Sequence, residues 1–249
     1  MARFTNRVAV VTGAGSGLGR ATAGRLAAEG ALVAAVDLDG GAAEKAVAEI
    51  GERGGTARAY AVDVSDPAQA RAAVDAAAGD LGRPQVLVNC AGVLSFTHTL
   101  DETYEGWSKI LAVNLTGTFL TSQAALRHML DNGGVIVNVA SNAGLMGQPY
   151  TAAYCASKGG VVNLTRALAV EYVRRRVRVN AVAPGGMNTP MVSGIEFPEG
   201  IHERDFARVT SPLGYAEPEE VAALVAYVAS DDARYMTGTI VSIDGGITA

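Results

Sequence analysis

Short apolar runs alternate with longer segments of helical spacing along the 249-residue chain. We interpret the apolar runs as buried strands and the segments between them as helices. The expected strands cover residues 7–11, 31–36, 56–62, 86–89, 135–140, 177–183 and 239–243. The expected helices cover residues 20–29, 41–53, 67–81, 102–130 and 218–230, with a further helix that starts near residue 151.

Strands that alternate with helices of this length predict an α/β fold: one Rossmann-type, doubly wound parallel sheet of about seven strands with helices on both faces. No linker, repeat or low-complexity tract interrupts the pattern, so residues 1–249 are expected to form a single domain. The segment 187–210 breaks the alternation and mixes apolar with charged residues after the sixth strand. We interpret it as a substrate lid.

Composition excludes several classes of protein. A hydrophobic content of 49% excludes disorder, and a net charge of -5 argues against a nucleic-acid or anionic-membrane partner. The basic cluster Arg174, Arg175, Arg176 and Arg178 is interpreted as a solvated helix end, where cations complement the helix dipole.

Cysteine usage and the chain's beginning indicate the compartment. Cys90 and Cys155 fall within predicted core elements, so no disulfide framework is expected. Residues 1–7 do not resemble a signal peptide, and no apolar run approaches the roughly 20 residues that span a bilayer. We therefore expect a soluble cytoplasmic protein. The histidines at 98, 128 and 202 lack ligand spacing, so no metal site is expected.

A glycine-rich turn, Thr12-Gly13-Ala14-Gly15-Ser16-Gly17-Leu18-Gly19, joins the first strand to the first helix. The usual dinucleotide fingerprint G-x-G-x-x-G does not fit, whereas a wider turn through Gly13, Gly17 and Gly19 does. Free N–H groups and the helix dipole at such a turn bind phosphate. Glycines that merely allow a tight turn remain the alternative. The candidate contacts are Gly13, Ser16, Gly17, Leu18 and Gly19.

The second strand ends on Asp37, followed by Leu38. A carboxylate at this position accepts hydrogen bonds from both ribose hydroxyls of an adenosine and repels a 2′-phosphate. No lysine or arginine flanks it, and residue 16 is serine. The pattern favours NAD over NADP.

Further polar and small residues follow the next strands. Asp63 and Val64 close the third strand, where they can contact an adenine edge. The segment Asn89-Cys90-Ala91-Gly92 closes the fourth, and its small residues allow a cofactor to pass close. Asn114 is an isolated polar residue in an apolar helical region. A core asparagine that kinks the helix is one interpretation, and a functional residue is the other.

Ser141 ends the fifth strand, and Tyr154 and Lys158 lie one turn apart on the helix that follows. An ammonium near a phenol favours phenolate, so we expect the pKa of Tyr154 to fall from about 10 toward that of a general base. A tyrosine and a lysine at this spacing are also common on ordinary helices.

Together these residues resemble the short-chain dehydrogenase/reductase family over essentially the whole chain. The matching motifs are Thr12-Gly13-x-x-x-Gly17-x-Gly19, Asp63-Val64, Asn89-x-Ala91-Gly92, Asn114, Ser141, Tyr154-x-x-x-Lys158, and Pro184-Gly185 with Thr189. The sequence departs from the family at Cys90, where many members have a second asparagine; that departure affects only a sheet-stabilising hydrogen bond.

The resemblance implies a catalytic tetrad of Asn114, Ser141, Tyr154 and Lys158. Tyr154 would exchange a proton with the substrate oxygen, and Ser141 would polarise that oxygen. Lys158 would bind the nicotinamide ribose and lower the pKa of Tyr154. Asn114 would hold a water that links Lys158 to solvent.

Other family properties extend to the cofactor and the assembly. Pro184, Gly185, Met187 and Thr189 would follow the carboxamide end of the cofactor. Asp63, Val64, Asn89, Ala91 and Gly92 would line its adenosine and ribose parts. The resemblance also implies a homotetramer, and the spacing of Tyr154 and Lys158 favours carbon–oxygen over carbon–carbon reduction.

The substrate is expected to be a secondary alcohol or ketone of moderate size in a mostly apolar pocket. Candidate pocket residues are the lid, Leu145, Met146, Gln148, Tyr150 and Met187, while Phe197 and Phe206 either face this pocket or anchor the lid. His98 either approaches the pocket or lies in solvent. One alternative is a 3-oxoacyl-thioester reductase acting on acyl-carrier-protein or CoA substrates, with Arg127, His128 and Arg174–Arg176 as a docking patch. A non-catalytic NAD-binding scaffold is a remote alternative.

Overall fold

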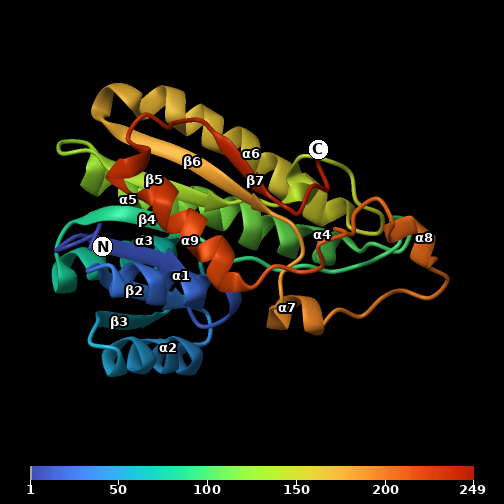
Figure 1. Ribbon diagram of the computed structural model, residues 1–249, viewed down its shortest axis with the longest axis horizontal. Helices are drawn as coiled ribbons and strands as arrows, with labels where there is room; N and C mark the ends of the chain where they lie inside the picture. The colour runs from blue at the N-terminus through green and yellow to red at the C-terminus, as the bar shows by residue number, and fades with distance from the viewer. Residues whose placement is uncertain (1) are drawn as a thin grey trace.

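The computed structural model describes residues 2–249. Seven parallel strands form one sheet in the order β3-β2-β1-β4-β5-β6-β7, as Figure 1 shows. The strands are β1 (Val8–Thr12), β2 (Leu32–Asp37), β3 (Thr56–Ala61), β4 (Pro84–Asn89), β5 (Gly134–Val139), β6 (Val177–Pro184) and β7 (Ile240–Ile243). The predicted doubly wound sheet is confirmed.

Helices cover both faces of the sheet. One face carries α1 (Gly17–Ala28), α2 (Gly40–Glu52) and α9 (Pro218–Ala229). The other carries α3 (Pro67–Leu81), α4 (Tyr104–Leu111), α5 (Gly117–Met129) and α6 (Ala152–Tyr172). None of these helices, described within residues 2–249, is long and apolar enough to cross a membrane.

The core consists of two apolar layers, because successive residues of a strand point to opposite faces. In β1, Ala9 and Val11 pack against α1 and α9, whereas Val10 packs against α3 and α5. In β4, Val88 belongs to the layer under α1 and α9, and Leu87 belongs to the layer under α3 and α5. Strands buried on both faces are therefore apolar throughout, which is the pattern that identified them in the sequence.

Two elements differ from their predicted bounds for identifiable reasons. Helix α1 begins at Gly17 instead of residue 20, because Ser16 is its N-cap and the glycine turn is itself the helix start. The predicted helix 102–130 is interrupted by a π-helical turn, η1 (Ala112–Thr116), between α4 and α5. Asn114 lies in this turn, which confirms that the helix departs from regular geometry there.

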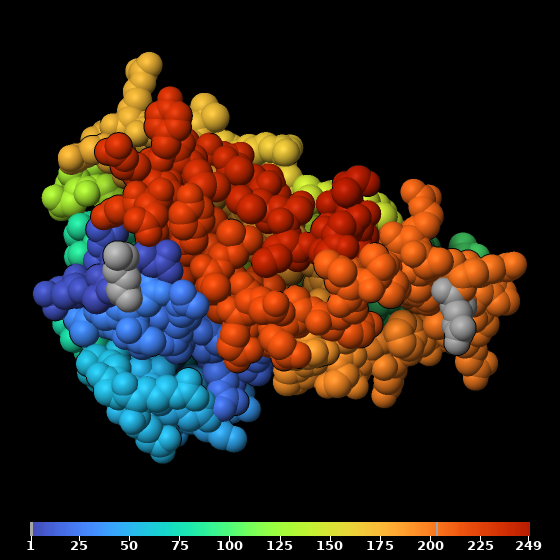
Figure 2. Space-filling view, viewed as in Figure 1, coloured from blue at the N-terminus to red at the C-terminus, as the bar shows by residue number. Residues whose placement is uncertain are grey.

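The predicted lid segment, residues 187–210, contains two short helices, α7 (Pro190–Ser193) and α8 (Glu203–Phe206). It projects from one end of the molecule in Figures 1 and 2, and α8 lies far from the sheet. Its base is joined to the body where the Asn188 N–H donates to Ala216 O and the Ala216 N–H donates to Gly186 O, both at 3.0 Å.

Arg178 is not part of the solvated helix end predicted for residues 174–178. Helix α6 ends at Tyr172, and Arg178 lies in β6. Its guanidinium donates to Val228 O at 3.1 Å and Ser230 O at 2.9 Å, the free carbonyls at the end of α9. Burial lowers the pKa of Arg178. Arg174–Arg176 are exposed, as expected.

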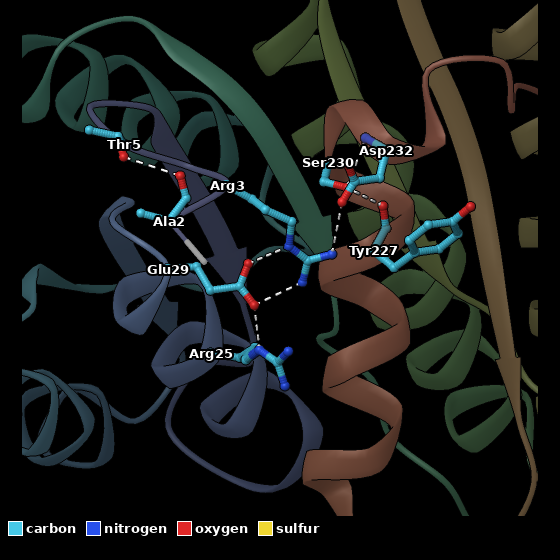
Figure 3. A network of polar contacts seen from close by, with 8 residues as sticks. All are labelled: Ala2, Arg3, Thr5, Arg25, Glu29, Tyr227, Ser230 and Asp232. Atoms are coloured by element: carbon cyan, nitrogen blue, oxygen red, sulfur yellow. Dashed lines mark hydrogen bonds and ion pairs between the residues drawn. The ribbon is translucent and has the colours of Figure 1, made fainter.

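A second polar network fastens the N-terminal segment to the ends of α1 and α9 (Figure 3). Arg3 donates to both carboxylate oxygens of Glu29 at 2.6 and 2.8 Å and lies 3.6 Å from Asp232. Arg25 also binds Glu29, at 2.5 Å. The hydrogen bond from Arg3, followed by that from Arg25, lowers the pKa of Glu29. Burial of Glu29 acts in the opposite direction and is outweighed. The network joins the ends of α1 and α9, two of the three helices that cover this face of the sheet.

Replacing Arg178 by methionine should lower the free energy of unfolding by about 2–4 kcal/mol, because it leaves carbonyls at the end of α9 unpaired. Urea denaturation monitored by circular dichroism measures the difference. Arg175→Met, which removes an exposed arginine, is the matched control and should change stability by less than about 0.5 kcal/mol. Equal stability of the two variants would contradict the assignment of Arg178.

Candidate active site

A cleft of about 530 Å³ opens at the carboxyl edge of the sheet, where the strand order reverses between β1 and β4. Ligands of doubly wound sheets bind at this position. The predicted site residues that line it are Gly13, Ser16, Gly17, Leu18, Gly19, Asp37, Leu38, Asp63, Val64, Ala91, Gly92, Ser141, Tyr154, Lys158, Pro184, Gly185, Met187 and Thr189. Asn89 and Asn114 lie behind its wall.

The glycine turn has the shape of a phosphate cradle. Gly13 has φ +66°, and a Cβ there would approach the Ala91 backbone to 2.9 Å. A Cβ on Gly19 would lie 1.9 Å from the Gly13 carbonyl oxygen. Glycine is therefore required for the turn to close. Because the first residues of α1 line the cleft, its N-terminal N–H groups and dipole fit a pyrophosphate.

The Asp37 carboxylate is held at the opposite side of this turn. One oxygen accepts the Gly15 N–H at 2.8 Å, and the other accepts the Asp39 N–H at 3.0 Å. A Cβ on Gly15 would lie 2.9 Å from the carboxylate, so glycine allows the contact. Each oxygen keeps a further acceptor position, which fits a ribose hydroxyl.

Asn89 cross-links the sheet to α5, and it is not among the residues that line the cleft, so the cofactor contact expected of it stays a prediction. Its Nδ2 donates to Asn138 Oδ1 at 2.9 Å and Ser122 Oγ at 3.0 Å, and its Oδ1 accepts from Thr121 Oγ1 at 2.7 Å. The side chain is buried, and both amide ends are engaged. This network aligns the ends of β4 and β5.

Asn114 joins the loop after β4 to α6. Its Oδ1 accepts the Val93 N–H at 2.8 Å, while Nδ2 donates to Val93 O at 2.9 Å and Ser157 Oγ at 3.1 Å. A Cβ on Gly92 would lie 3.3 Å from Asn114 Oδ1 and 3.6 Å from Lys158 Nζ. Asn114 therefore fixes the cleft wall next to Lys158. Its expected part in a proton path stays a prediction.

Ser141 is oriented by the 3₁₀ turn η2 (Asn142–Gly144), which it caps. Its Oγ accepts the Ala143 N–H at 3.1 Å and donates to Asn142 Oδ1 at 3.1 Å. Asn142 is itself held by Gln148, whose Nε2 donates to the same oxygen at 2.9 Å. The serine hydroxyl is thus positioned on the cleft wall before any ligand interaction.

The acidities of Tyr154 and Lys158 are governed by burial. Burial raises the pKa of Tyr154 to about 12, and the Ser141 hydroxyl opposes this rise. Burial also lowers the pKa of Lys158 to about 8. Lys158 Nζ donates to Val139 O at 2.8 Å and lies 5.7 Å from the centre of the Tyr154 ring. The shift for the protein's own side chains is therefore opposite to the fall expected from the sequence, because desolvation outweighs the hydrogen bond from Ser141.

The structure places only part of the predicted substrate-pocket residues in the cleft. Met187 lines it, together with Pro190, Met191 and Val93, whereas Leu145, Met146, Gln148 and Tyr150 do not. Phe197 and Phe206 also lie outside the cleft and pack with each other at 5.5 Å between ring centres. They anchor the lid and do not face the pocket. His98 binds the lid through Glu199 O at 2.9 Å.

Three residues that support or line the site were given no part in it from the sequence. Thr12 Oγ1 accepts the N–H groups of Cys90 and Ala91, both at 3.1 Å, and so sets the path of the cleft wall. Ser157 links Asn114 to the Tyr154 carbonyl at 2.8 Å. Cys90 lines the cleft, and burial raises its thiol pKa to about 12. All three residues lie within the motifs named above, but the contacts that give Thr12 and Ser157 their roles reach segments distant in sequence, which the motifs alone do not show.

The sheet, the glycine turn and the grouping of Ser141, Tyr154 and Lys158 define a short-chain dehydrogenase/reductase. Within residues 2–249, no three histidine, cysteine, aspartate or glutamate side chains come together as a metal site. The glycine cradle and the Asp37 carboxylate at its side fit a dinucleotide.

Comparison with known proteins supports this class of protein. A family model described as enoyl-(acyl carrier protein) reductase matches residues 13–248. The 2-(S)-hydroxypropyl-CoM dehydrogenase 3 of Xanthobacter autotrophicus is 43% identical over 99% of this chain and 98% of its own length. The meso-2,3-butanediol dehydrogenase of Serratia marcescens is 43% identical over 99% of this chain and 96% of its own length. The crystal structure of a short-chain type dehydrogenase/reductase from Mycobacterium marinum has a TM-score of 0.90 at 37% identity, covering 99% of this chain and 97% of that one.

The chain therefore belongs to the short-chain dehydrogenase/reductase family. It is an oxidoreductase that interconverts alcohol and carbonyl groups with a nicotinamide cofactor.

Lys158→Met should stabilise the protein at neutral pH. The pKa of Lys158 is lowered from 10.5 to about 8, so the unfolded chain binds its proton more tightly than the folded protein. The resulting cost is about 3 kcal/mol below pH 8 and vanishes as the pH rises through 10.5. Since the hydrogen bond to Val139 is lost, we expect a net gain of about 1–2 kcal/mol at pH 7.

Urea denaturation of both proteins at pH 7 and at pH 10 tests this prediction. The advantage of the variant should shrink at the higher pH. A variant that is less stable than the wild type by the same amount at both pH values would show that burial of the ammonium is not costly.

Proposed function

We propose that the protein is an NAD-dependent dehydrogenase of a secondary alcohol, or reductase of the corresponding ketone, in which Tyr154 is the general acid/base. The observation that carries the proposal is the shared cleft. Tyr154, Ser141 and Lys158 line one end of it, and the Asp37 carboxylate lies at the other. This arrangement suits a dinucleotide that extends from its adenosine ribose to a reacting carbon.

In this proposal Tyr154 removes the hydroxyl proton during oxidation and returns it to the carbonyl during reduction. Ser141 donates a hydrogen bond to the same oxygen, where negative charge develops in the transition state. The Ala143 N–H holds Ser141 Oγ in place, and rotation of the hydroxyl away from Asn142 Oδ1, to which it donates in this structure, directs its one proton to the substrate. The hydroxyl of Ser141 also favours the phenolate form of Tyr154.

Lys158 holds the nicotinamide ribose and adds positive charge near the phenol. When bound, NAD accepts or supplies the hydride, and its oxidised ring brings a further positive charge to the cleft. Both charges oppose the desolvation that raises the pKa of Tyr154 to about 12. We therefore expect the phenol to reach the working range of a general base only in the complex with the oxidised cofactor.

Asp37 supports NAD as the cofactor. Its carboxylate lines the cleft and is held by two backbone N–H groups, so it cannot turn away from a 2′-phosphate without losing them. Neighbouring Leu38 and Ser16 provide no cation for such a phosphate. NADP is therefore disfavoured by like-charge repulsion.

A 3-oxoacyl-thioester reductase remains the second candidate within the family. The docking patch expected for an acyl carrier does not support it. Arg127 and His128 end α5, and Arg174–Arg176 precede β6, so these cations lie at the amino edge of the sheet, opposite the cleft. His128 is in addition bound to Asp75 at 2.8 Å. Small substrates, or thioesters delivered without such a patch, fit the structure better.

The scaffold alternative lacks support, because all four tetrad residues are present and Ser141, Tyr154 and Lys158 share the cleft. We also propose a cytoplasmic homotetramer. Exposed apolar side chains on one face of the molecule favour assembly: Trp107 of α4, Phe119 of α5 and Val170 of α6.

Tyr154→Phe should lower kcat/KM by about a thousandfold, because it removes the proton donor and acceptor while keeping the ring. Initial rates of NADH formation across secondary alcohols, polyols, hydroxysteroids and 3-hydroxyacyl thioesters measure this effect. NAD binding, followed by calorimetry, should stay near the wild-type value. Substantial remaining turnover would exclude Tyr154 as the acid/base.

Asp37→Ala should reduce the preference for NAD over NADP by about 10- to 100-fold, since two ribose hydrogen bonds to a charged group and one repulsion are lost. The ratio of kcat/KM for the two cofactors measures the preference. Asp39→Ala, a carboxylate two residues further on at the start of α2, is the control and should leave the ratio unchanged. An unaltered ratio in Asp37→Ala would refute the assigned role.

A further inference from the structure

The tip of the lid, residues 195–210, is fastened to the body by a cluster that lies outside the cleft. The cluster, called the clasp below, consists of Phe96, His98, Tyr150, Phe197 and Phe206, with the carboxylate of Asp205. It joins three segments that are distant in sequence: the loop after β4, the loop before α6, and the lid. No part of the clasp belongs to the catalytic tetrad.

Aromatic contacts form the body of the clasp. The Phe96 ring meets the Phe197 ring edge-on at 5.0 Å and the Phe206 ring at 6.0 Å. Tyr150 contacts Phe206 at 5.8 Å and His98 edge-on at 5.0 Å. Phe197 is 53% exposed, so the lid tip is held by few contacts and not by a buried core. Such a contact can open without unfolding the sheet.

Two hydrogen bonds complete the clasp. The Tyr150 hydroxyl donates to Asp205 Oδ2 at 2.6 Å, and His98 Nε2 lies 2.9 Å from the Glu199 carbonyl oxygen. The phenol bond is the stronger of the two, because its acceptor is ionised. In agreement, Tyr150 lowers the pKa of Asp205.

Tyr150 occupies a position that links the lid to the catalytic helix. It has φ +62°, a left-handed conformation that is unfavourable for a residue with a side chain. Its carbonyl oxygen accepts the Thr97 N–H at 2.8 Å, and α6 starts two residues later. Tyr150 is therefore held at its carbonyl oxygen by Thr97 and at its hydroxyl by Asp205. Tyr154 follows four residues later along the chain.

The other end of the lid forms part of the cleft. Met187, Thr189, Pro190 and Met191 line it on the substrate and nicotinamide side. A lid held at its tip keeps these residues over the cleft, whereas a released tip leaves them attached only at the base. A lid that closes over a bound ligand must move before that ligand can leave.

We propose that Tyr150, through its hydrogen bond to Asp205, is a positioning residue that holds the lid closed and thereby limits the exchange of cofactor and product. The proposal rests on the function proposed above, because a lid matters only where ligands enter and leave. It assigns Tyr150 to lid closure instead of the substrate contact expected from the sequence.

Limited trypsin digestion of the folded full-length protein tests the clasp without any need for turnover. Arg204 and Arg208 are exposed lid residues, and cleavage after them reports how often the lid opens. Tyr150→Phe removes only the hydroxyl and should increase cleavage at these two sites about tenfold. Mass spectrometry separates these fragments from those produced at Arg174–Arg176.

Kinetic measurements then connect the clasp to the reaction. In Tyr150→Phe, NADH release in a stopped-flow chase with excess NAD should accelerate about tenfold, and KM should rise. The deuterium isotope effect on kcat should increase, because release limits turnover less. Asp205→Ala should behave like Tyr150→Phe, Asp205→Asn should lie between them and the wild type, and the double variant should show no added effect.

Tyr60→Phe is the matched control. Tyr60 lies in β3, the outermost strand on the side of the sheet away from β7, and its hydroxyl donates to the Asp80 carboxylate at 2.9 Å. Loss of this hydrogen bond should change neither lid cleavage nor NADH release. Equal lid cleavage in the wild type, Tyr60→Phe and Tyr150→Phe would overturn the proposal. So would a loss of turnover in Tyr150→Phe with unchanged cleavage, since Tyr150 would then act on the substrate or α6. A protein that turns over no tested alcohol, yet shows faster lid cleavage in Tyr150→Phe, would refute the proposed function and leave the clasp supported.

Discussion

Parallel pairing in register between β1, β4 and β5 is the constraint on which the rest of the site depends. Thr12 pairs with Asn89, and Asn89 pairs with Asn138, so the three strands end at one level. A buried hydrogen bond of 2.9 Å between the two asparagines cross-links these ends. The glycine turn, the Gly92 loop and Ser141 consequently surround a single cleft. A slip of one residue would move Asn89 to the other face of the sheet and break this alignment.

The helices run antiparallel to the strands, so helix N-termini lie at the carboxyl edge of the sheet and helix C-termini lie at the amino edge. Helix α1 presents its N-terminal N–H groups at the carboxyl edge, where they suit phosphate. Helix α9 ends at the amino edge, where its free carbonyls are satisfied by Arg178. Arg178 therefore completes a helix end, and the exposed Arg174–Arg176 lie at the same edge, away from the cleft.

Burial of the two titratable side chains at the site disfavours their charged forms. It disfavours both the ammonium of Lys158 and the phenolate of Tyr154, which are the forms that the proposed reaction uses. The protein keeps Lys158 in place through Val139 O and the surrounding wall. In the proposed function, the positive charge of a bound oxidised cofactor would shift this balance toward phenolate in a region of low dielectric.

The sequence by itself determined the sheet, the glycine turn, the Asp37 carboxylate and the grouping of Ser141, Tyr154 and Lys158. Each depends on apolar period, turn chemistry or spacing within one segment, which local physics specifies. Only the tertiary structure decided that Asn89 is a buried cross-link, that Arg178 serves α9, and that Tyr150 turns toward the lid instead of the cleft. The direction of the Tyr154 pKa shift was likewise decided by tertiary burial. Desolvation and hydrogen bonding depend on which distant segments meet, and no single segment carries that information.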